Sequence, residues 1–111
     1  MFVATLVAPA VAQAGLNQCT GTKMCVWGNN DFNWLIAAQN HGQPVIDVFN
    51  DANGENNQAD SWANRSSTYN GCLYDGQGSS PLKTMNKSSN DNNMLFLDSD
   101  RTSSMRTNGG C

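Results

Sequence analysis

The chain contains two degenerate copies of one segment, and this duplication most constrains how it can fold. The first copy opens at Cys25 with CVWGNNDFNW and closes with NNQADSW at Trp62. The second opens at Cys72 with CLYDGQGSSP and closes with SDRTSSM at Met105. The openings lie 47 residues apart and the closing turns 43 residues apart. A repeat of this length is typical of one supersecondary unit that buries its apolar face against its twin. A chance match within Asn- and Ser-rich sequence is the alternative.

The first 14 residues are predicted to be a secretory signal peptide. Phe2 to Ala12 is uncharged and apolar, is too short to span a bilayer, and is followed by the small-x-small pattern that ends at Ala14. No Lys or Arg precedes this run, so either translation starts upstream of Met1 or the signal is weak. A buried element of the mature fold is the alternative interpretation. We expect a secreted, extracellular protein in which residues 15–111 form a single domain.

The four cysteines are predicted to form disulfides, because an exported domain of this size gains only marginal stability from its core. Four cysteines allow three pairings, which the sequence does not separate. We favour Cys19 with Cys25, and Cys72 with Cys111. A zinc site is the alternative, but the chain has no CxxC pair and its only histidine is His41.

Short runs of strand-forming residues between Asn, Asp, Gly and Ser clusters predict an all-β fold. The expected strands are Met24–Trp27, Pro44–Phe49, Cys72–Tyr74 and Met94–Leu97. The stretch Trp34–Gln39 fits a helix start or a strand that closes the first hairpin. Gln77–Asn93 is expected to be mostly loop, with one short strand near Leu82–Met85. The copies, about 19–66 and 70–111, should pack as two Greek-key sheets face to face around one core.

The net charge of −3 argues against a nucleic-acid partner. The six basic residues are scattered along the sequence and predict no basic patch: Lys23, Arg65, Lys83, Lys87, Arg101 and Arg106. His41 stands in a polar stretch, and the chain lacks a nucleophile elbow and an HExxH motif, so we expect a protein that is not an enzyme. We also expect a monomer that does not bind membranes.

The two copies resemble the βγ-crystallin Greek-key motif, in which two spaced aromatics and a Gly precede the turn N/D-N/D-x-x-S/T-S. Trp27 and Phe32 match the aromatics of the first copy, with Trp34 in place of the Gly; Tyr74 matches the first aromatic of the second copy. The turns match at Asn56–Ser61, with Asp60 in place of Ser or Thr, and at Ser99–Ser104. The opening CTGTKMCVWGNNDF resembles more narrowly the secreted bacterial metalloproteinase inhibitors of the Streptomyces type. The resemblance implies a βγ-crystallin-like sandwich of two Greek keys, stapled by disulfides.

The resemblance also implies a possible calcium site, although no cofactor is required by the sequence. The oxygens that the turns supply are those that Ca²⁺ prefers. Carried over from the family, the ligands are the carbonyls of Gln58 and Arg101 with the side chains of Asp60 and Ser103, and Asp75 could add a carboxylate. The alternative is that the turns only join neighbouring hairpins through side-chain hydrogen bonds.

Two functions follow as hypotheses. The first is inhibition of a secreted proteinase through an exposed, pre-ordered loop. Its partner surface is expected in Gln77–Asn93, with Leu82 and Met85 as possible anchors. The second is a calcium-stabilised extracellular structural module that inhibits nothing.

Overall fold

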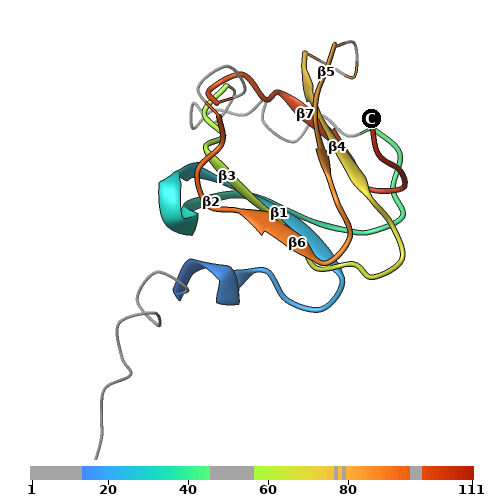
Figure 1. Cartoon of the computed structure of the whole chain (residues 1–111), viewed down its shortest axis with the longest axis horizontal. Helices are drawn as coiled ribbons and strands as arrows, with labels where there is room; N and C mark the ends of the chain where they lie inside the picture. The colour runs from blue at the N-terminus through green and yellow to red at the C-terminus, as the bar shows by residue number, and fades with distance from the viewer. Residues whose placement is uncertain (1–13, 46–56, 77, 79, 96–98) are drawn as a thin grey trace, which may run out of the picture.

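The computed structural model describes residues 14–45, 57–76, 78, 80–95 and 99–111. Within these ranges the chain forms two short 3-10 helices and seven β-strands: η1 (Ala14–Gln18), β1 (Lys23–Asn29), η2 (Asn30–Phe32), β2 (Asn33–Asn40), β3 (Ser61–Asn64), β4 (Gly71–Asp75), β5 (Ser80–Met85), β6 (Ser89–Asp91) and β7 (Ser104–Arg106). The strands form two antiparallel sheets, in the orders β2-β1-β3-β6 and β5-β4-β7, which face one another (Figure 1). None of the described helices is long and apolar enough to cross a bilayer. The predicted all-β fold is confirmed.

The two sequence copies are equivalent in structure. Each begins with a hairpin, β1–β2 or β4–β5, whose register shifts immediately before the first aromatic residue, Trp27 or Tyr74. Each first strand then pairs on its other side with the strand that follows the polar turn, so that Trp27 lies opposite Ser61 and Tyr74 opposite Ser104. These paired positions are separated by the same 47 and 43 residues that relate the copies in the sequence. The repeat is therefore structural, not a chance match.

Strand β6 crosses from the second copy into the sheet of the first. It follows β5 in the chain, yet it pairs with β3, with Trp62 opposite Asp91 and Asn64 opposite Ser89. Such a return to a distant strand is the Greek-key connection. The first sheet is therefore built from both copies, whereas the described strands of the second sheet all come from the second copy.

Several predicted strands are confirmed and others are corrected. Met24–Trp27 lies in β1, Cys72–Tyr74 lies in β4, and Trp34–Gln39 is a strand within β2. The short strand near Leu82–Met85 lies within β5, but Gln77–Asn93 is not mostly loop, because it also contains β6.

The prediction of a strand over Met94–Leu97 is wrong for its first two residues. The Met94 N–H donates to the Asp60 carbonyl at 2.8 Å and its side chain is buried in the core, whereas Leu95 is exposed. Met94 thus follows a turn and fills the core as a single apolar residue, not as part of an alternating strand. Pro44 and Val45 lie outside any strand, and the remainder of these two predicted strands lies outside the described residues.

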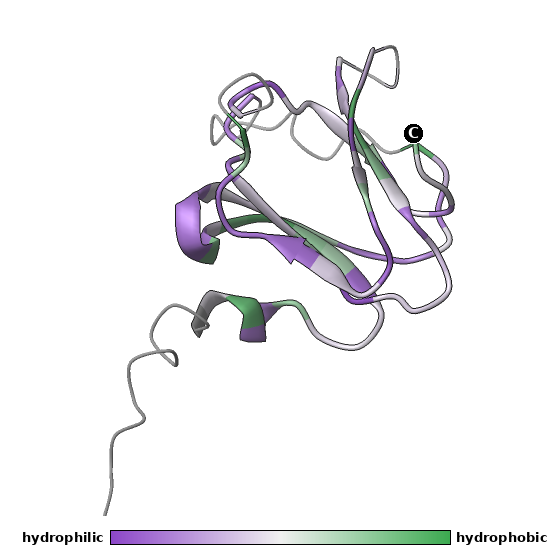
Figure 2. Ribbon diagram, viewed as in Figure 1, coloured by the Kyte–Doolittle hydropathy of each residue, from purple (hydrophilic) through white to green (hydrophobic). Residues whose placement is uncertain are grey.

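The main core fills the space between the two sheets. Its buried side chains come from both copies: Met24, Val26, Ala37, Ala59, Trp62, Leu73, Met85, Met94 and Met105. Four of these are methionines, whose unbranched side chains adapt to irregular gaps. Figure 2 shows the hydrophobic residues running along the facing strands β1 and β4.

A second apolar cluster covers the outer face of the first sheet. Along β1, Met24 and Val26 point toward the main core, and alternate residues Cys25 and Trp27 point toward η1. Leu16 of η1 packs in this outer cluster, and Trp27 Nε1 donates to Gln18 Oε1 at 2.9 Å. Strand β1 is consequently buried on both faces.

Both favoured disulfides are present, and the described residues contain no free cysteine. Cys19–Cys25 closes a loop of six residues and ties the segment after η1 to β1. Cys72–Cys111 spans 39 residues and fastens the end of the described chain to β4.

The first hairpin carries an aromatic corner that explains the sequence pattern. The rings of Trp27 and Phe32 meet edge to face with centroids 5.0 Å apart. Trp34 has φ of +66°, a left-handed conformation that glycine adopts without steric cost and that bulky residues rarely adopt. Its indole occupies the space above Gly28, where an added Cβ would lie 2.1 Å from Trp34 Cε3. Trp34 can replace the motif's Gly here because Gly28 leaves room for the ring.

Candidate cation-binding turns

The two polar turns face each other about an approximate two-fold axis. The N–H of Asn57, the second residue of the first turn, donates to the carbonyl of Thr102, the fourth residue of the second turn, at 3.0 Å. The N–H of Asp100, the second residue of the second turn, donates to the carbonyl of Ala59, the fourth residue of the first, also at 3.0 Å. These reciprocal bonds join the two copies where their turns meet.

Each turn is also bonded to its own sheet by matching contacts. The fifth residue of the turn donates its N–H to the first aromatic: Asp60 to the Trp27 carbonyl at 2.9 Å, and Ser103 to the Tyr74 carbonyl at 2.8 Å. The sixth residue donates its hydroxyl to the carbonyl two residues beyond that aromatic: Ser61 to Asn29 at 2.8 Å, and Ser104 to Gly76 at 2.7 Å. The Ser that closes the motif therefore has a defined structural role in both copies.

The backbone conformation at the second position of each turn explains why the motif has Asn or Asp there. Asn57 and Asp100 both have left-handed backbone angles, with φ of +62° and +58°. Asn and Asp tolerate this conformation better than other residues with a side chain. Their backbone N–H groups then point across to the opposite turn.

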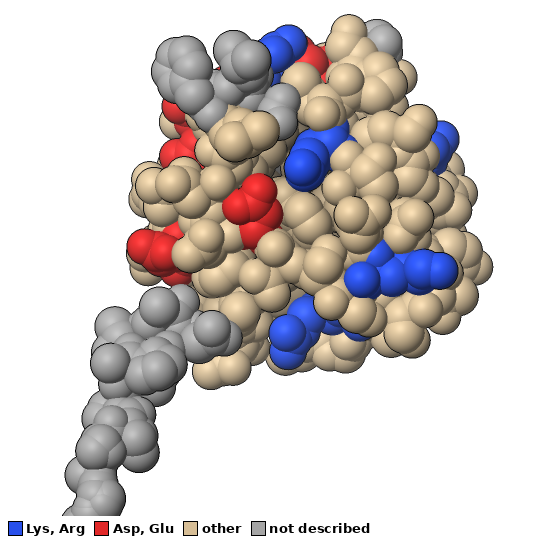
Figure 3. All heavy atoms as spheres, viewed as in Figure 1, with Lys and Arg blue, Asp and Glu red and all other residues tan. Residues whose placement is uncertain are grey.

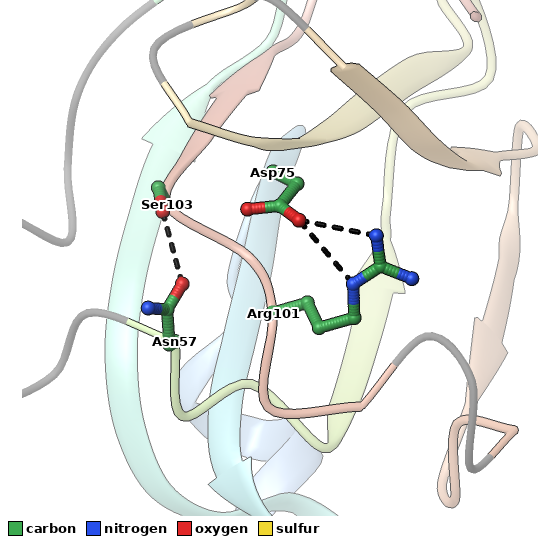
Figure 4. A network of polar contacts seen from close by, with 4 residues as sticks. All are labelled: Asn57, Asp75, Arg101 and Ser103. Atoms are coloured by element: carbon green, nitrogen blue, oxygen red, sulfur yellow. Dashed lines mark hydrogen bonds and ion pairs between the residues drawn. The ribbon is translucent and has the colours of Figure 1, made fainter.

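The side chains at equivalent positions differ in charge between the two halves of the junction. The Ser103 hydroxyl donates to Asn57 Oδ1 at 3.1 Å, and Figure 4 shows these side chains pointing toward one another. The equivalent pair in the other half is Asp60 and Asp100, two carboxyl groups that line the same hollow. Burial, the charge of Asp100 and a hydrogen bond between the two carboxyls raise the pKa of Asp60 from 3.8 to about 6. One half of the junction is therefore neutral and the other acidic.

The acidic half opens into a hollow of about 440 Å³. Oxygen-bearing side chains contribute to its lining: Asn30, Asp60, Asn93, Ser99 and Asp100. Carboxylate, amide and hydroxyl oxygens are the ligand types that hard cations such as Ca²⁺ prefer. The described residues contain no cluster of three or more His, Cys, Asp or Glu, so carboxylates alone would not complete a coordination sphere here.

The predicted ligands are only partly brought together. Asp60 lines the hollow, whereas Gln58, Arg101 and Ser103 are not among its lining residues, and Ser103 instead contacts Asn57. The Asp75 carboxylate lies against Arg101, with Oδ2 3.1 Å from the guanidinium Nη2 and 3.3 Å from Nε (Figure 4). In this geometry the Asp75 carboxylate pairs with the Arg101 guanidinium, and Asp75 does not line the hollow.

Sequence reasoning missed Asp100 as a site residue, and with it Asn30 and Asn93. Asp100 could have been found from the motif, because an approximate two-fold axis brings the second position of one turn to the fifth position of the other. Asn30 and Asn93 carried no such signal, since they reach the hollow only through the packing of η2 and the chain after β6.

The two residues expected to anchor a partner lie in different environments. Met85 is fully buried in the main core, so its assignment as a surface anchor is corrected. Its side chain packs inward because β5 pairs with β4 and places Met85 opposite Gly71. Leu82 is half-buried on the same strand, and its contact with a partner stays a prediction.

The single imidazole contacts neighbouring loops. His41 Nδ1 lies 2.7 Å from Ser66 Oγ, and its ring meets the Tyr69 ring edge to face at 5.1 Å between centroids. Both contacts link the residue that follows β2 to the segment that precedes β4. The expectation that the protein is not an enzyme stays a prediction.

Comparison with known proteins finds fold relatives only. No protein-family model and no curated protein sequence matches the chain. A structure from work on the evolution of the eye-lens βγ-crystallin domain fold is similar with a TM-score of 0.63 and 14% identity, covering 77% of this chain and 83% of the other. A βγ-crystallin domain from Flavobacterium johnsoniae has a TM-score of 0.56 and 15% identity over 75% of this chain and 90% of its own. The N-terminal domain of Protein S has a TM-score of 0.55 and 20% identity over 76% and 92%.

These similarities confirm the βγ-crystallin-like fold. At identities of 20% or less they establish the fold and not the function. The narrower resemblance to the Streptomyces-type inhibitors stays a prediction from the sequence.

Proposed function

We propose that this protein is an extracellular structural module of βγ-crystallin type whose facing turns bind a hard cation, with Ca²⁺ as the physiological candidate. The observation that carries the proposal is that Asp60 and Asp100 line the same hollow at the junction of the two copies, together with amide and hydroxyl side chains. Two carboxylates in contact repel each other unless a proton or a cation lies between them. The two disulfides support an extracellular setting, because such bonds persist in oxidising compartments.

The binding site would act as a clamp on the fold. The hollow is lined by residues of both copies, including Asn30 and Asp60 from the first and Asn93 and Asp100 from the second. A cation held there favours the arrangement in which the two turns face each other. Because it binds the folded state alone, it stabilises that state by mass action, by about 2.7 kcal/mol when its concentration is 100 times Kd. The Asn30, Asn93 and Ser99 oxygens, with water and backbone carbonyls, would supplement the carboxylates.

Thermal unfolding in Ca²⁺ and in chelator tests this proposal. At pH 7.5, excess Ca²⁺ should raise the melting temperature of the unmodified protein. Asp60→Asn should have two effects: a higher melting temperature in chelator, because the repulsion from Asp100 is removed, and loss of most of the Ca²⁺-dependent increase. Asp100→Asn should behave similarly.

Asp75→Asn is the matched control, since it removes one surface carboxylate that pairs with Arg101. The Ca²⁺-dependent increase should persist in this variant. Identical melting curves of the unmodified protein in Ca²⁺ and in chelator would show that the turns are structural links alone.

Proteinase inhibition stays a prediction that rests on the opening segment from Cys19 to Phe32. It is tested by titrating the purified domain against metallo-, serine and cysteine proteinases. Stoichiometric inhibition of a metalloproteinase that survives added Zn²⁺ would support it. If no proteinase is inhibited at a micromolar concentration of the domain, the structural module remains as the proposed function.

A further inference from the structure

Basic residues that are scattered in the sequence gather at one end of the first sheet. Because β1 and β3 are antiparallel, with Met24 opposite Asn64, the start of β1 lies beside the end of β3. Lys23 and Arg65 are therefore neighbours, and the Arg65 N–H donates to the Lys23 carbonyl at 3.0 Å. Two basic residues that are distant in the sequence therefore meet at this end of the sheet.

A third basic residue reaches the same end from the second copy. Lys87 lies in the loop between β5 and β6. The next residue, Ser88, donates its N–H to the Ser66 carbonyl at 2.9 Å, and Ser89 pairs with Asn64. The crossing of β6 into the first sheet thus brings Lys87 to the end of the sheet where Lys23 and Arg65 already meet.

The acidic residues of the same three strands lie at the opposite end. Asp31 follows β1, Asp60 precedes β3 and Asp91 ends β6. Figure 3 shows most of the acidic side chains toward the left of the view, with basic side chains toward the lower right and others near the top and the right edge. The two hollows share no lining residue, and Asp60 of one is separated from Arg65 of the other by the length of β3.

The basic end encloses a hollow of about 360 Å³. Its lining comes from three separate segments and includes no carboxylate: Gly21, Asn64, Arg65, Ser88, Ser89 and Asn90. Gly21 has φ of +63°, and an added Cβ there would meet nothing within 4 Å, so the mouth of the hollow is open at this point. Asn64 is committed to the fold, because its Nδ2 donates to the Tyr69 and Met85 carbonyls, both at 2.9 Å.

We propose that this hollow binds a tetrahedral oxyanion, sulfate or phosphate, either free or carried by a polyanionic polymer. The exposed Arg65 guanidinium offers paired N–H donors that match two oxyanion oxygens. Lys23, whose carbonyl accepts from the Arg65 N–H, and Lys87, which precedes Ser88, raise the positive charge near the hollow. Ser88 and Asn90 bring further polar side chains to its lining. Each exposed contact contributes little alone, so the ligand is held by their convergence and its affinity falls with ionic strength.

An NMR titration of the ¹⁵N-labelled protein at low ionic strength tests the proposal. Sodium phosphate and a heparin fragment are the probes, and sodium chloride at equal ionic strength is the reference. The amides of Gly21, Ser88 and Asn90 should shift with a probe and not with chloride. If only phosphate saturates the amide shifts, the ligand is a free ion. If only the heparin fragment saturates them, the ligand is a group carried by a polymer.

Arg65→Gln and Lys83→Gln form a matched pair, because each removes one positive charge and Lys83 lies on β5 of the other sheet. Arg65→Gln should weaken binding about tenfold, as expected for loss of a charge-assisted paired contact, whereas Lys83→Gln should change it less than about twofold. Thermal unfolding confirms that both variants fold. The proposal is overturned if neither probe shifts these amides, or if both variants weaken binding equally. Neither the titration nor the comparison of the variants requires Ca²⁺, so both are independent of the test for cation binding.

Discussion

At the fifth position of the two turns the chain places different side chains, Asp60 and Ser103. The Ser103 hydroxyl can donate to Asn57 at any pH, so this half of the junction needs no additional ion. Asp60 can make the equivalent contact with Asp100 only when a proton is shared between the two carboxyls. A single substitution at an otherwise symmetric junction thus makes one half sensitive to protons and cations.

The raised pKa of Asp60 predicts the pH dependence of stability in chelator. The Asp60 carboxyl has a pKa of about 6 in the folded state against an ordinary value of 3.8, so between these pH values the folded state binds more protons than the unfolded state. The free energy of unfolding should therefore fall as pH rises from about 4 to about 6, and its Asp60 contribution should level off above that range. The size should be on the order of 1 kcal/mol after solvent screening.

Urea unfolding from pH 4 to 8 measures this contribution as the difference between the unmodified protein and Asp60→Asn. The variant should lack the Asp60 slope. A difference that is constant with pH, or that changes in the opposite direction, would contradict the assignment. Saturating Ca²⁺ should reduce the loss near pH 7, because the cation takes the place of the shared proton.

The two disulfides hold different elements and close loops of very different length. Cys19–Cys25 joins the turn before β1 to β1 itself, across a separation of six residues. Cys72–Cys111 joins β4 to the segment after β7, across 39 residues. A longer closed loop removes more entropy from the unfolded chain.

We therefore expect loss of Cys72–Cys111 to cost more stability than loss of Cys19–Cys25, roughly 4 against roughly 2 kcal/mol from loop closure. Paired Cys→Ala variants compare the two bonds without leaving a free thiol. Denaturant unfolding monitored by tryptophan fluorescence gives both free energies. The reverse order would mean that the anchoring of η1 on the outer face of β1 outweighs the entropy of the longer loop.

Over the whole molecule, the two copies are interleaved and do not form independent halves. Strand β6 of the second copy completes the sheet of the first, and Leu73, Met85 and Met105 of the second copy pack against Met24 and Val26 of the first. A fragment of residues 14–66 lacks β6 and exposes its inner face. We expect it to show no cooperative thermal unfolding by circular dichroism.

Fragment 67–111 supplies the natural complement, because each fragment retains one intact disulfide. Mixing the two fragments should restore dispersed amide resonances and a cooperative transition. Cooperative unfolding of 14–66 alone would show that one Greek-key copy is sufficient for a stable fold.

The sequence by itself determined the features that depend on local order along the chain. It predicted β1 and β4 from their strand-forming residues, the presence of disulfides from the even cysteine count, and the repeat from the matched openings and turns. The motif also located Ser61 and Ser104, whose equivalent hydroxyl contacts depend on the same local backbone path in each copy. These features are readable because neighbouring residues impose them.

The tertiary structure alone decided which distant segments meet. Pairing of β6 with β3 placed Lys87 beside Arg65, and the facing turns placed Asp60 against Asp100. Met85 was expected on the surface, but the register of β5 on β4 turns it into the core. Such contacts depend on how two sheets pack and cross, and this is set by the burial of both copies together. The sequence pattern of either copy alone carries no information about it.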